Sequence, residues 1–453
     1  MGFNKDFAWG VATASYQIEG GAYEDGKGLS VWDEFCKIPD KIADGYTGEV
    51  ACDHYHSYKQ DIRLMKSMGI KAYRFSISWP RVMPNGTGEI NEKGMEFYHN
   101  LISELIDNGI EPYVTLFHWD YPYALHNQGG WLNPESSNWF AEYAKVITER
   151  FSDRVKYFIT FNEPQCFIGL GYHHALHAPG VKMSLKDGLQ MAHNVLLAHG
   201  KAVKMIRQHA KVQVKIGYAP TCSMTYPVTE SDENIEAARK ALFSMPNSGE
   251  DWSWNVTWWS DPVFFGKYPE DGIKLFQGNM PFIAEGDMDI IAQPLDFYGQ
   301  NIYNGAPIVA TPSGGFERLK RAAGHAKAAN GWPITPQTLY WGPKFLYERY
   351  KLPIYITENG MVESDVIALD GYVHDPNRID FLHRYLKELK RASDEGIVIK
   401  GYFLWSFMDN FEWAHGFNAR FGLVYVDYST QKRIVKDSGY WYRDTILQNG
   451  KNI

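Results

Sequence analysis

Cysteine is scarce in this chain, which has only Cys36, Cys52, Cys166 and Cys222 among its 453 residues. No two of them have the CxxC spacing of a metal or redox site, and four are too few to cross-link a chain of this length. The sequence therefore excludes a disulfide scaffold and contains no zinc-binding motif. We expect four free thiols, no metal and no cofactor.

Long apolar runs and an excess of positive charge are also missing. No stretch approaches the roughly 20 apolar residues that a membrane-spanning helix needs, and the first residues, Met1–Asp6, contain no apolar signal core. The net charge of −8 disfavours nucleic acid as a partner. We therefore expect a cytoplasmic protein that binds neither membranes nor nucleic acid. The oligomeric state stays open.

Short apolar segments that end in polar, Gly or Pro residues recur along the whole chain, as buried parallel strands do. Amphipathic stretches lie between them, and no linker or composition shift divides the chain. The pattern predicts a single (β/α)₈ barrel domain over residues 1–453. A doubly wound sheet would be the competing fold, but no GxGxxG follows the first strand. The predicted strands are Phe7–Ser15, Lys71–Ser78, Pro112–Phe117, Tyr157–Asn162, Val214–Ala219, Leu295–Tyr303, Pro353–Thr357 and Lys400–Phe407.

The predicted helices and loops follow from the same alternation. Long segments follow several strands, at Gln165–Lys186, Thr221–Leu275 and Asn304–Gln337, and we expect them to build a deep pocket at the carboxyl-terminal face of the barrel. The predicted helices are Tyr58–Met68, Glu92–Asn108, Asn138–Phe151, Leu185–Gln208, Pro336–Tyr350 and Asn377–Glu395.

Two glutamates stand at the ends of predicted strands nearly two hundred residues apart. Glu163 lies in Thr160-Phe161-Asn162-Glu163-Pro164 and Glu358 lies in Ile356-Thr357-Glu358-Asn359-Gly360. A closed parallel barrel brings all its strand ends to one rim, where barrel enzymes have their active sites. Two carboxylates that face each other across a pocket are what cleavage of a glycosidic bond requires. A single such glutamate is more often structural, but the pair favours catalysis.

These two strings resemble the acid/base and nucleophile motifs of glycoside hydrolase family 1, the β-glucosidase family. The resemblance extends along nearly the whole chain. It includes the segments Phe7–Gly20, Tyr73–Arg81, Phe117–Asp120 and Trp405–Trp413.

The resemblance implies a retaining, exo-acting β-glucosidase that hydrolyses cellobiose, aryl β-glucosides and short β-gluco-oligosaccharides through a covalent glycosyl-enzyme. Some β-galactosidase, β-fucosidase and transglycosylation activity is compatible with it. It implies Glu163 as acid/base and Glu358 as nucleophile, about 5–5.5 Å apart. Arg74 and Tyr303 match the family residues beside the nucleophile, and a cation there is expected to lower the pKa of Glu358.

The sugar-binding residues also come from the resemblance, by their positions in the matching segments. Trp405 matches the tryptophan under the sugar ring and Trp332 matches one on the leaving-group side. The other residues implied to bind substrate are Gln17, His118, Trp119, Asn162, Tyr303, Glu412, Trp413 and Phe421. The high aromatic content, 15% with 15 Trp and 29 Tyr, suits sugar faces, although most of these rings are expected in the core.

The chain departs from the usual family pattern at Gln165, Ile302, Tyr121 and Tyr123. We expect these positions to face the leaving group and to affect its selection.

A 6-phospho-β-glucosidase is the nearest competing function. It is disfavoured because Ala414 and Ala419-Arg420-Phe421 stand where phospho-enzymes usually have Ser, Lys and Tyr. A catalytically silent sugar-binding protein would be expected to lose one of the two glutamates, and both are present. A metal-dependent barrel hydrolase would need a set of ligands that the sequence does not show.

Three further patterns are interpreted as structural. His54 and His56, and His173, His174 and His177, have no complete ligand set for a metal. The tryptophans at 252, 254, 258 and 259 are expected to pack beneath the pocket. The basic segment Arg318–Arg321 is expected to be a solvated surface.

Overall fold

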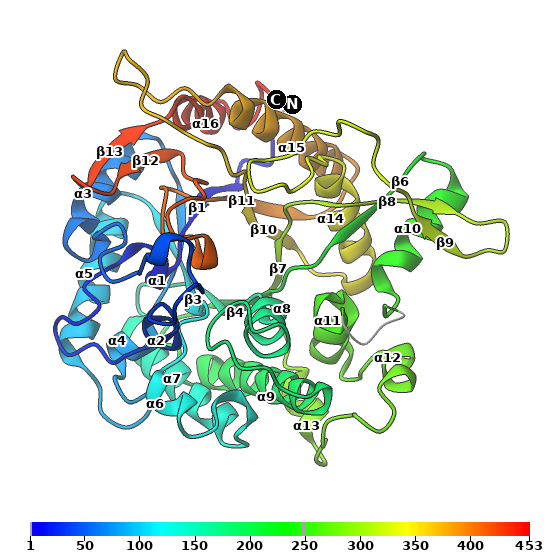
Figure 1. Ribbon diagram of the computed structural model, residues 1–453, viewed down its shortest axis with the longest axis horizontal. Coiled ribbons are helices and arrows are strands. Elements are labelled where there is room, and N and C mark those ends of the chain that lie inside the picture. Colours follow the sequence, from blue (N-terminus) through cyan, green and yellow to red (C-terminus); the bar gives the residue numbers. More distant parts are fainter. Residues whose placement is uncertain (1, 247–250) are drawn as a thin grey trace.

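Eight parallel strands form a closed barrel in the computed structural model, which describes residues 2–246 and 251–453 (Figure 1). Around the barrel the order is β1-β11-β10-β7-β5-β4-β3-β2. The predicted (β/α)₈ fold and all eight predicted strands are confirmed. The barrel strands are β1 (Ala8–Ala12), β2 (Ala72–Ser76), β3 (Glu111–Phe117), β4 (Tyr157–Asn162), β5 (Lys215–Ala219), β7 (Phe297–Asn301), β10 (Ile354–Asn359) and β11 (Ile399–Trp405).

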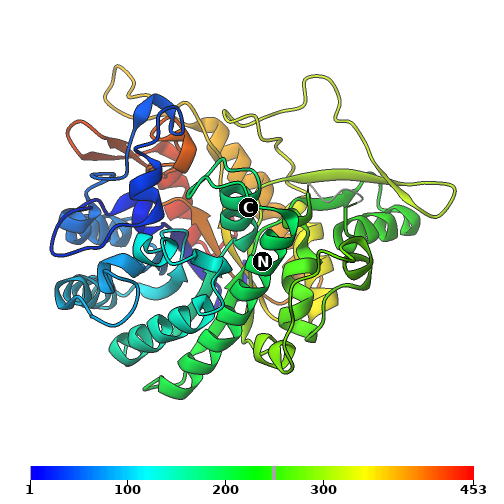
Figure 2. The same cartoon turned by 60° about the horizontal axis from the view of Figure 1, so that its bottom comes forward.

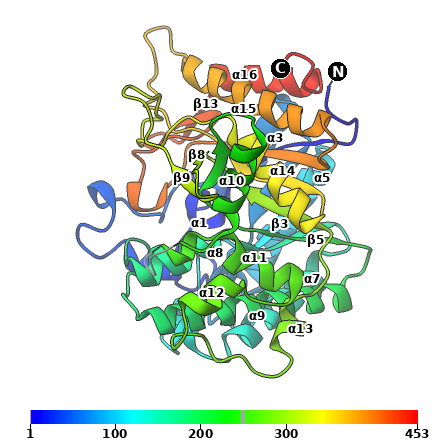
Figure 3. The same ribbon diagram turned by 90° about the vertical axis from the view of Figure 1, so that its right-hand side faces the viewer.

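The first and the last barrel strands pair with each other. β1 runs parallel to β11 from Ala8 opposite Gly401 to Ala12 opposite Trp405. The two ends of the chain therefore lie side by side (Figures 1 and 3). There the Trp9 indole donates a hydrogen bond of 2.9 Å to the Asn449 side chain.

Helices cover the outside of the barrel, and α7 and α9 pack against each other (Figure 2). The six predicted helices are present, with ends that differ by a few residues. The long helices are α3 (His54–Ser67), α5 (Glu92–Asp107), α7 (Ser136–Phe151), α9 (Leu185–His209), α14 (Thr338–Tyr350), α15 (Pro376–Asp394) and α16 (Asp437–Leu447). Short helices follow several strands: α1 (Ser15–Ile18), α2 (Val31–Phe35), α4 (Trp79–Val82), α6 (Tyr123–His126) and α8 (Pro164–Ile168). Within the described ranges no helix is long and apolar enough to cross a membrane.

Aromatic side chains fill one level of the barrel interior. Tyr113 lies with its ring centroid 4.1 Å from that of Tyr157 and 4.8 Å from that of Phe403. The Phe297 and Tyr355 rings lie 4.9 Å apart. Side chains on one face of a strand recur every second residue. Two residues beyond Tyr113 on β3, Thr115 accepts a hydrogen bond of 3.1 Å from Arg74 of β2, and the candidate site begins here.

The segments predicted as long loops contain structure that the sequence pattern does not reveal. β6 (Met224–Pro227), β8 (Gly305–Ala310) and β9 (Phe316–Arg318) form a separate sheet that projects beside α10 (Asp232–Phe243) (Figures 1 and 3). The basic segment Arg318–Arg321 thus begins in a strand, and its residues are exposed. Further elements are α11 (Val256–Phe265), α12 (Glu270–Leu275), α13 (Asp287–Ile291) and the hairpin of β12 (Val424–Asp427) and β13 (Lys432–Val435).

Candidate active site

The two predicted glutamates lie at the carboxyl ends of β4 and β10, and a β-bulge precedes each of them. Between Ile159 and Asn162, β4 advances three residues while β5 advances from Gly217 to Ala219. Between Ile356 and Glu358, β10 advances two residues while β7 advances one. A bulge redirects the side chains that follow it. Both glutamates consequently line the same cavity.

Glu358 is held by a cation and a phenol. The Arg74 guanidinium donates to Glu358 Oε1 over 2.7 Å, and the Tyr303 hydroxyl donates to Oε2 over the same distance. Arg74 also donates from Nη2 to Asn162 Oδ1 over 2.6 Å. Both members of the Arg74–Glu358 ion pair are almost fully buried, so water screens their interaction little.

The orientation of Asn162 and the tautomer of His118 follow from Arg74. Because a guanidinium can only donate hydrogen bonds, the Asn162 atom that faces it is the oxygen. The Asn162 amide nitrogen then donates to His118 Nε2 over 2.9 Å. His118 is therefore neutral and carries its proton on Nδ1. Burial, together with the charge of Arg74, lowers the pKa of His118 well below its usual value.

Asn301 joins the two halves of the site, although the sequence motifs did not predict a role for it. Its amide nitrogen donates to Asn162 Oδ1 over 2.9 Å and to Glu163 Oε1 over 2.7 Å. Its amide oxygen accepts a hydrogen bond of 2.7 Å from the Thr357 hydroxyl. The position of Asn301 at the last residue of β7, two residues before Tyr303, is the signal that could have identified it.

Burial dominates the proton affinity of the carboxyls. It raises the pKa of Glu163 to about 8, and the nearby charge of Glu358 adds to the effect. Burial also raises the pKa of Glu358, although Arg74 and Tyr303 act in the opposite direction. The expected direction of the Arg74 effect is confirmed, since the cation lowers the pKa of Glu358, although desolvation raises it more. A cation favours the ionised form of Glu358, whereas the donors to Glu163 are the neutral Asn301 and Cys166.

The cavity has a volume of about 430 Å³, within the usual range for small-ligand sites. Most of the predicted site residues line it. Among them are His118, Trp119, Asn162 and Tyr303. The cavity is also lined by Trp332 and by four residues here called the inner wall: Trp405 at the end of β11, and Glu412, Trp413 and Phe421 after it. Arg74 and Gln17 lie directly behind this lining.

Gln17 reaches the inner wall from α1. Its amide nitrogen lies 3.2 Å from Glu412 Oε2 and 3.0 Å from Asn410 Oδ1, to both of which it can donate. Burial, followed by the charge of Glu358, raises the pKa of Glu412 to about 8. The Trp119 ring lies against the wall, tilted by 30° to the Trp413 ring with their centroids 4.6 Å apart.

The four positions that depart from the family pattern do not line the cavity. Gln165 is fully buried and accepts a hydrogen bond from the Thr221 amide. Ile302 and Tyr121 belong to the hydrophobic core, and Tyr123 packs against it. The expectation that these side chains face the leaving group is therefore wrong: the first turn of α8 buries Gln165, and the other three pack into or against the hydrophobic core. The lining instead includes Cys166, Leu170, Thr221, Trp254, Asn304 and His415.

Of the tryptophans and histidines that the sequence analysis interpreted as structural, some are buried and others line the cavity. Trp252, Trp258 and Trp259 are fully buried, as expected, whereas Trp254 lines the cavity. His177 lines it as well.

The paired histidines near the start of α3 each contact carboxylates. His54 pairs with the buried Asp61, and the exposed His56 contacts Asp53 and Glu24. Across residues 2–246 and 251–453, no group of three or more His, Cys, Asp or Glu side chains is arranged to hold a metal ion.

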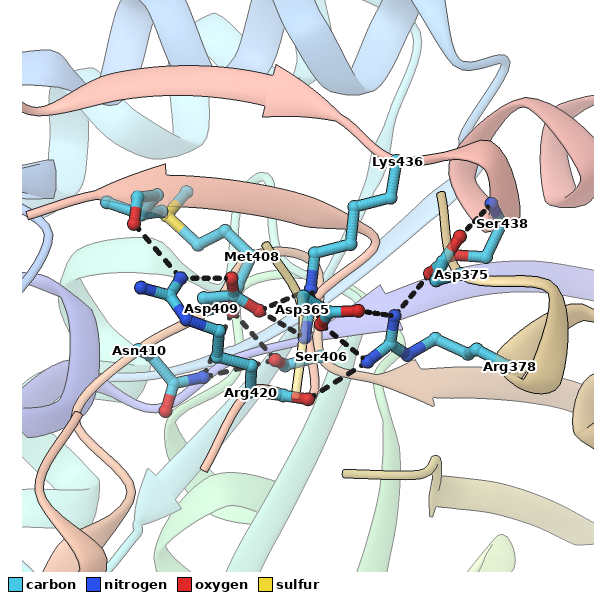
Figure 4. Close-up of polar contacts among 12 residues, drawn as sticks. Asp365, Asp375, Arg378, Ser406, Met408, Asp409, Asn410, Arg420, Lys436 and Ser438 are labelled. Atoms are coloured by element: carbon cyan, nitrogen blue, oxygen red, sulfur yellow. Dashed lines mark hydrogen bonds and ion pairs between the residues drawn. The ribbon is translucent and has the colours of Figure 1, made fainter. Parts of the chain in front are cut away.

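A buried ion network lies behind the inner wall (Figure 4). Lys436 donates to Asp409 over 2.6 Å and to Asp365 over 2.5 Å. Arg420 pairs with Asp409 over 2.6 Å, and Arg378 pairs with Asp365 over 2.8 Å. The network therefore ties the loop after β11 to the segment before α15 and to the start of α16.

Asp409 connects this network to the residues of the cavity. Its Oδ1 accepts from the Gly422 amide over 2.9 Å, next to Phe421. Its neighbour Asn410 accepts from Gln17. The sequence shows these residues only as parts of a motif, and their pairing depends on the fold.

The comparisons with known proteins agree with this geometry. The sequence model described as glycosyl hydrolase family 1 matches residues 1–451. Beta-glucosidase A of Thermotoga maritima is 45% identical over 449 residues, which cover 99% of this chain and 98% of that protein. Beta-glucosidase A of Acetivibrio thermocellus is 46% identical over 454 residues, 99% of each chain. The solved structure of beta-glucosidase from Thermotoga maritima in complex with glucoimidazole covers 99% of both chains, with 45% identity and a TM-score of 0.90.

Proposed function

This chain belongs to glycosyl hydrolase family 1 and is a β-glucosidase, and we propose that it removes terminal non-reducing β-D-glucosyl units by double displacement. Cellobiose, aryl β-glucosides and short β-gluco-oligosaccharides are the proposed substrates. The observation that carries this proposal is the unequal environment of two buried carboxyls in one cavity. Glu358 contacts a cation, whereas Glu163 contacts an amide and a thiol.

In the first step Glu358 attacks the anomeric carbon while Glu163 donates its proton to the departing oxygen. Arg74 and Tyr303 hold the nucleophile ionised and fix its orientation. Formation of the glycosyl ester removes the negative charge of Glu358. The pKa of Glu163 then falls, because that charge is one of the causes that raise it.

In the second step the ionised Glu163 takes a proton from water, and that water attacks the glycosyl-enzyme. Asn162 is positioned by Arg74 to donate toward the sugar 2-hydroxyl, in a contact that strengthens as positive charge develops on the ring. The proposed separation of the two carboxyls is about 5–5.5 Å, the value typical of retaining enzymes.

The remaining predicted residues are proposed to bind the glucosyl unit and its leaving group. Trp405 lies under the ring, and Glu412, Gln17 and His118 bind its hydroxyls. Trp119, Trp413 and Phe421 complete the sugar subsite. Trp332 is half-exposed at the rim, with its ring 5.2 Å from that of Tyr303, which supports a place beside the leaving group.

The distribution of charge disfavours a 6-phospho-β-glucosidase. The described residues that line the cavity include no lysine or arginine, whereas three glutamates line it. A phosphate needs cationic donors. Arg420, near the family phosphate position, is already paired with Asp409.

We propose that the whole chain is one catalytic domain, because its first and last barrel strands pair. We also propose that it acts in the cytoplasm on soluble glucosides, without a metal or a cofactor and without nucleic acid or membrane partners.

The decisive experiment is turnover of 4-nitrophenyl β-D-glucoside followed by ¹H NMR. The first sugar product is expected to be the β anomer, and the rate is expected to be unchanged in EDTA. No turnover would support a silent sugar-binding protein, and an α anomer formed first would contradict the double displacement. Loss of activity in EDTA would support a metal-dependent hydrolase. Faster turnover of the 6-phosphorylated glucoside would support the phospho-enzyme.

A further inference from the structure

Cys166 lies directly beside Glu163 because of the first turn of α8. Glu163 precedes this helix in a left-handed conformation, with φ of 46°. The Cys166 amide donates to the Glu163 carbonyl over 2.9 Å, and this turn brings the two side chains together. Cys166 Sγ lies 3.1 Å from Glu163 Oε2, and Cys166 is buried and lines the cavity.

The other oxygen of Glu163 has a partner that can only donate. Arg74 fixes the Asn162 oxygen, so the Asn301 atom that faces both Asn162 Oδ1 and Glu163 Oε1 is the amide nitrogen. The Thr357 hydroxyl, which donates to the Asn301 oxygen, holds the same orientation. An amide nitrogen cannot accept a hydrogen bond. Oε1 therefore remains an acceptor in both protonation states of Glu163.

The acidic proton of Glu163 must consequently reside on Oε2, the oxygen beside the thiol. A thiol is both a weak donor and a weak acceptor. Unlike the amide of Asn301, it can donate to Oε2 when Glu163 is ionised and turn aside when Oε2 carries the proton. A fixed donor at this place would oppose reprotonation in every catalytic cycle.

We propose that Cys166 is a positioning residue of the acid/base. Its thiol hydrogen-bonds Glu163 Oε2 in the ionised state and releases it in the protonated state, so that Oε2 alone exchanges the catalytic proton. This inference rests on the proposed function, in which Glu163 acts first as acid and then as base.

The proton balance is simple. Oε2 gives its proton to the leaving-group oxygen in the first step and takes one from water in the second. The thiol keeps its own proton throughout. In agreement, burial and the charge of Glu163 raise the pKa of Cys166 well above its usual value.

The test compares Cys166→Ala and Cys166→Ser through the alkaline limb of kcat/KM for 4-nitrophenyl β-D-glucoside. A hydrogen bond to the ionised carboxylate lowers its pKa. Removal of the thiol is therefore expected to move the limb upward by about half a pH unit. A hydroxyl is a stronger donor than a thiol, so Cys166→Ser is expected to move the limb downward.

A double-mutant cycle with Glu163→Gln shows whether Cys166 acts through the acid/base. In the wild-type background Cys166→Ala is expected to lower kcat/KM for phenyl β-D-glucoside about three- to tenfold. In the Glu163→Gln background the same change is expected to have no further effect. Cys36→Ser, which alters a buried thiol that does not line the cavity, is the matched control and is expected to retain the wild-type pH profile.

Two outcomes would overturn the inference. One is that the alkaline limbs of Cys166→Ala and Cys166→Ser move in the same direction or do not move. The other is that Cys166→Ala lowers kcat/KM equally in the wild-type and Glu163→Gln backgrounds. Cys166→Ser is nearly isosteric, so its pH profile decides the matter if the alanine variant does not fold. A wild-type enzyme that fails to hydrolyse aryl β-glucosides would refute the proposed function instead. The two failures are thus distinguishable.

Discussion

Glu163 and Glu358 are the same residue type in one cavity, and their proposed tasks differ because their contacts differ. Both of the Glu358 oxygens accept from ionic or phenolic donors, namely Arg74 and Tyr303. Glu163 accepts from neutral donors, Asn301 and Cys166. A cation favours the ionised form of a carboxyl, whereas burial without one favours the protonated form. The contacts thus assign nucleophile and acid at the scale of single residues.

Replacement of Glu163 by Gln is expected to slow substrates according to their leaving group. A phenyl or cellobiose leaving group needs the proton, so kcat/KM is expected to fall about 10²- to 10⁴-fold. A 2,4-dinitrophenyl group leaves without protonation, so its kcat/KM is expected to fall less than about tenfold. Initial rates for a series of aryl β-D-glucosides measure the difference.

Sodium azide provides the control for this variant. It needs no general base, so it is expected to restore the turnover of the dinitrophenyl substrate and to yield β-glucosyl azide. Equal losses across the aryl series would contradict the assignment of Glu163 as acid.

At the residue scale, motifs made most of the cavity predictable, and local backbone geometry limited the rest. His118, Asn162, Glu412 and Trp413 line the cavity as the resemblance implied. The sequence could not show that Cys166 lines the cavity and Gln165 does not, because this depends on the turn that follows the bulge in β4.

At the scale of elements, the inner wall depends on charges that do not touch the cavity. Lys436 is fully buried between Asp365 and Asp409, and each of these carboxylates also has an arginine partner (Figure 4). Buried ions need such partners, because removal of one leaves a charge without compensation. The loop that carries Glu412 and Trp413 is therefore held by the start of α16.

Replacement of Lys436 by Met is expected to destabilise the protein by about 2–3 kcal/mol. That is less than the roughly 3–5 kcal/mol usual for a broken buried pair, because Arg378 and Arg420 remain. Urea unfolding followed by tryptophan fluorescence measures the change. Lys432→Met, at an exposed position of β13, is the matched control and is expected to stay within about 0.5 kcal/mol of the wild type. A normal midpoint for Lys436→Met would show that the network does not hold the wall.

Helices were predicted from the sequence where their hydrophobic pattern was regular, and were missed where the helix is buried on nearly all sides. α15 has a clear amphipathic pattern, and its prediction was accurate to one residue at each end. α11 is buried on nearly all sides and contains Pro262, so it shows no helical periodicity. Its start was nevertheless marked, since the Asn255 side chain accepts from the Trp258 amide as a helix cap.

At the scale of the whole molecule, buried titratable groups set the dependence of stability on pH. Burial raises the pKa of Glu163 and Glu412 to about 8 and that of Asp120 to about 7. Unfolded carboxyls titrate near 4, so the folded chain binds more protons between about pH 4 and 8. Stability therefore falls as pH rises through this range. Burial lowers the pKa of His177 and His199 to about 3. Below pH 6.5 the unfolded chain therefore binds more protons at these two residues than the folded chain does, and their contribution to stability falls as the pH falls.

The melting temperature is accordingly expected to be highest between about pH 4.5 and 6.5 and to decline on both sides. Replacement of Glu163 by Gln removes one of the groups that cause the alkaline decline. Its melting temperature is expected to exceed that of the wild type by about 2–4 °C at pH 9 and by little at pH 5. Scanning calorimetry across this range measures both. A constant difference between the two proteins would contradict the linkage.

The pairing of β1 with β11 has a consequence for the growing polypeptide on the ribosome. A chain is made from its amino end, so Arg74, Glu163 and Glu358 are translated before β11 and the inner wall, which begins at Trp405. Until that last barrel strand arrives, β1 lacks one of its two neighbours. A chain that has not yet been translated to β11 therefore carries both catalytic carboxyls but lacks Trp405, Glu412 and Trp413, three of the residues proposed to hold a glucosyl unit. The hydrolytic site is complete only after β11 and the segment that follows it have been translated.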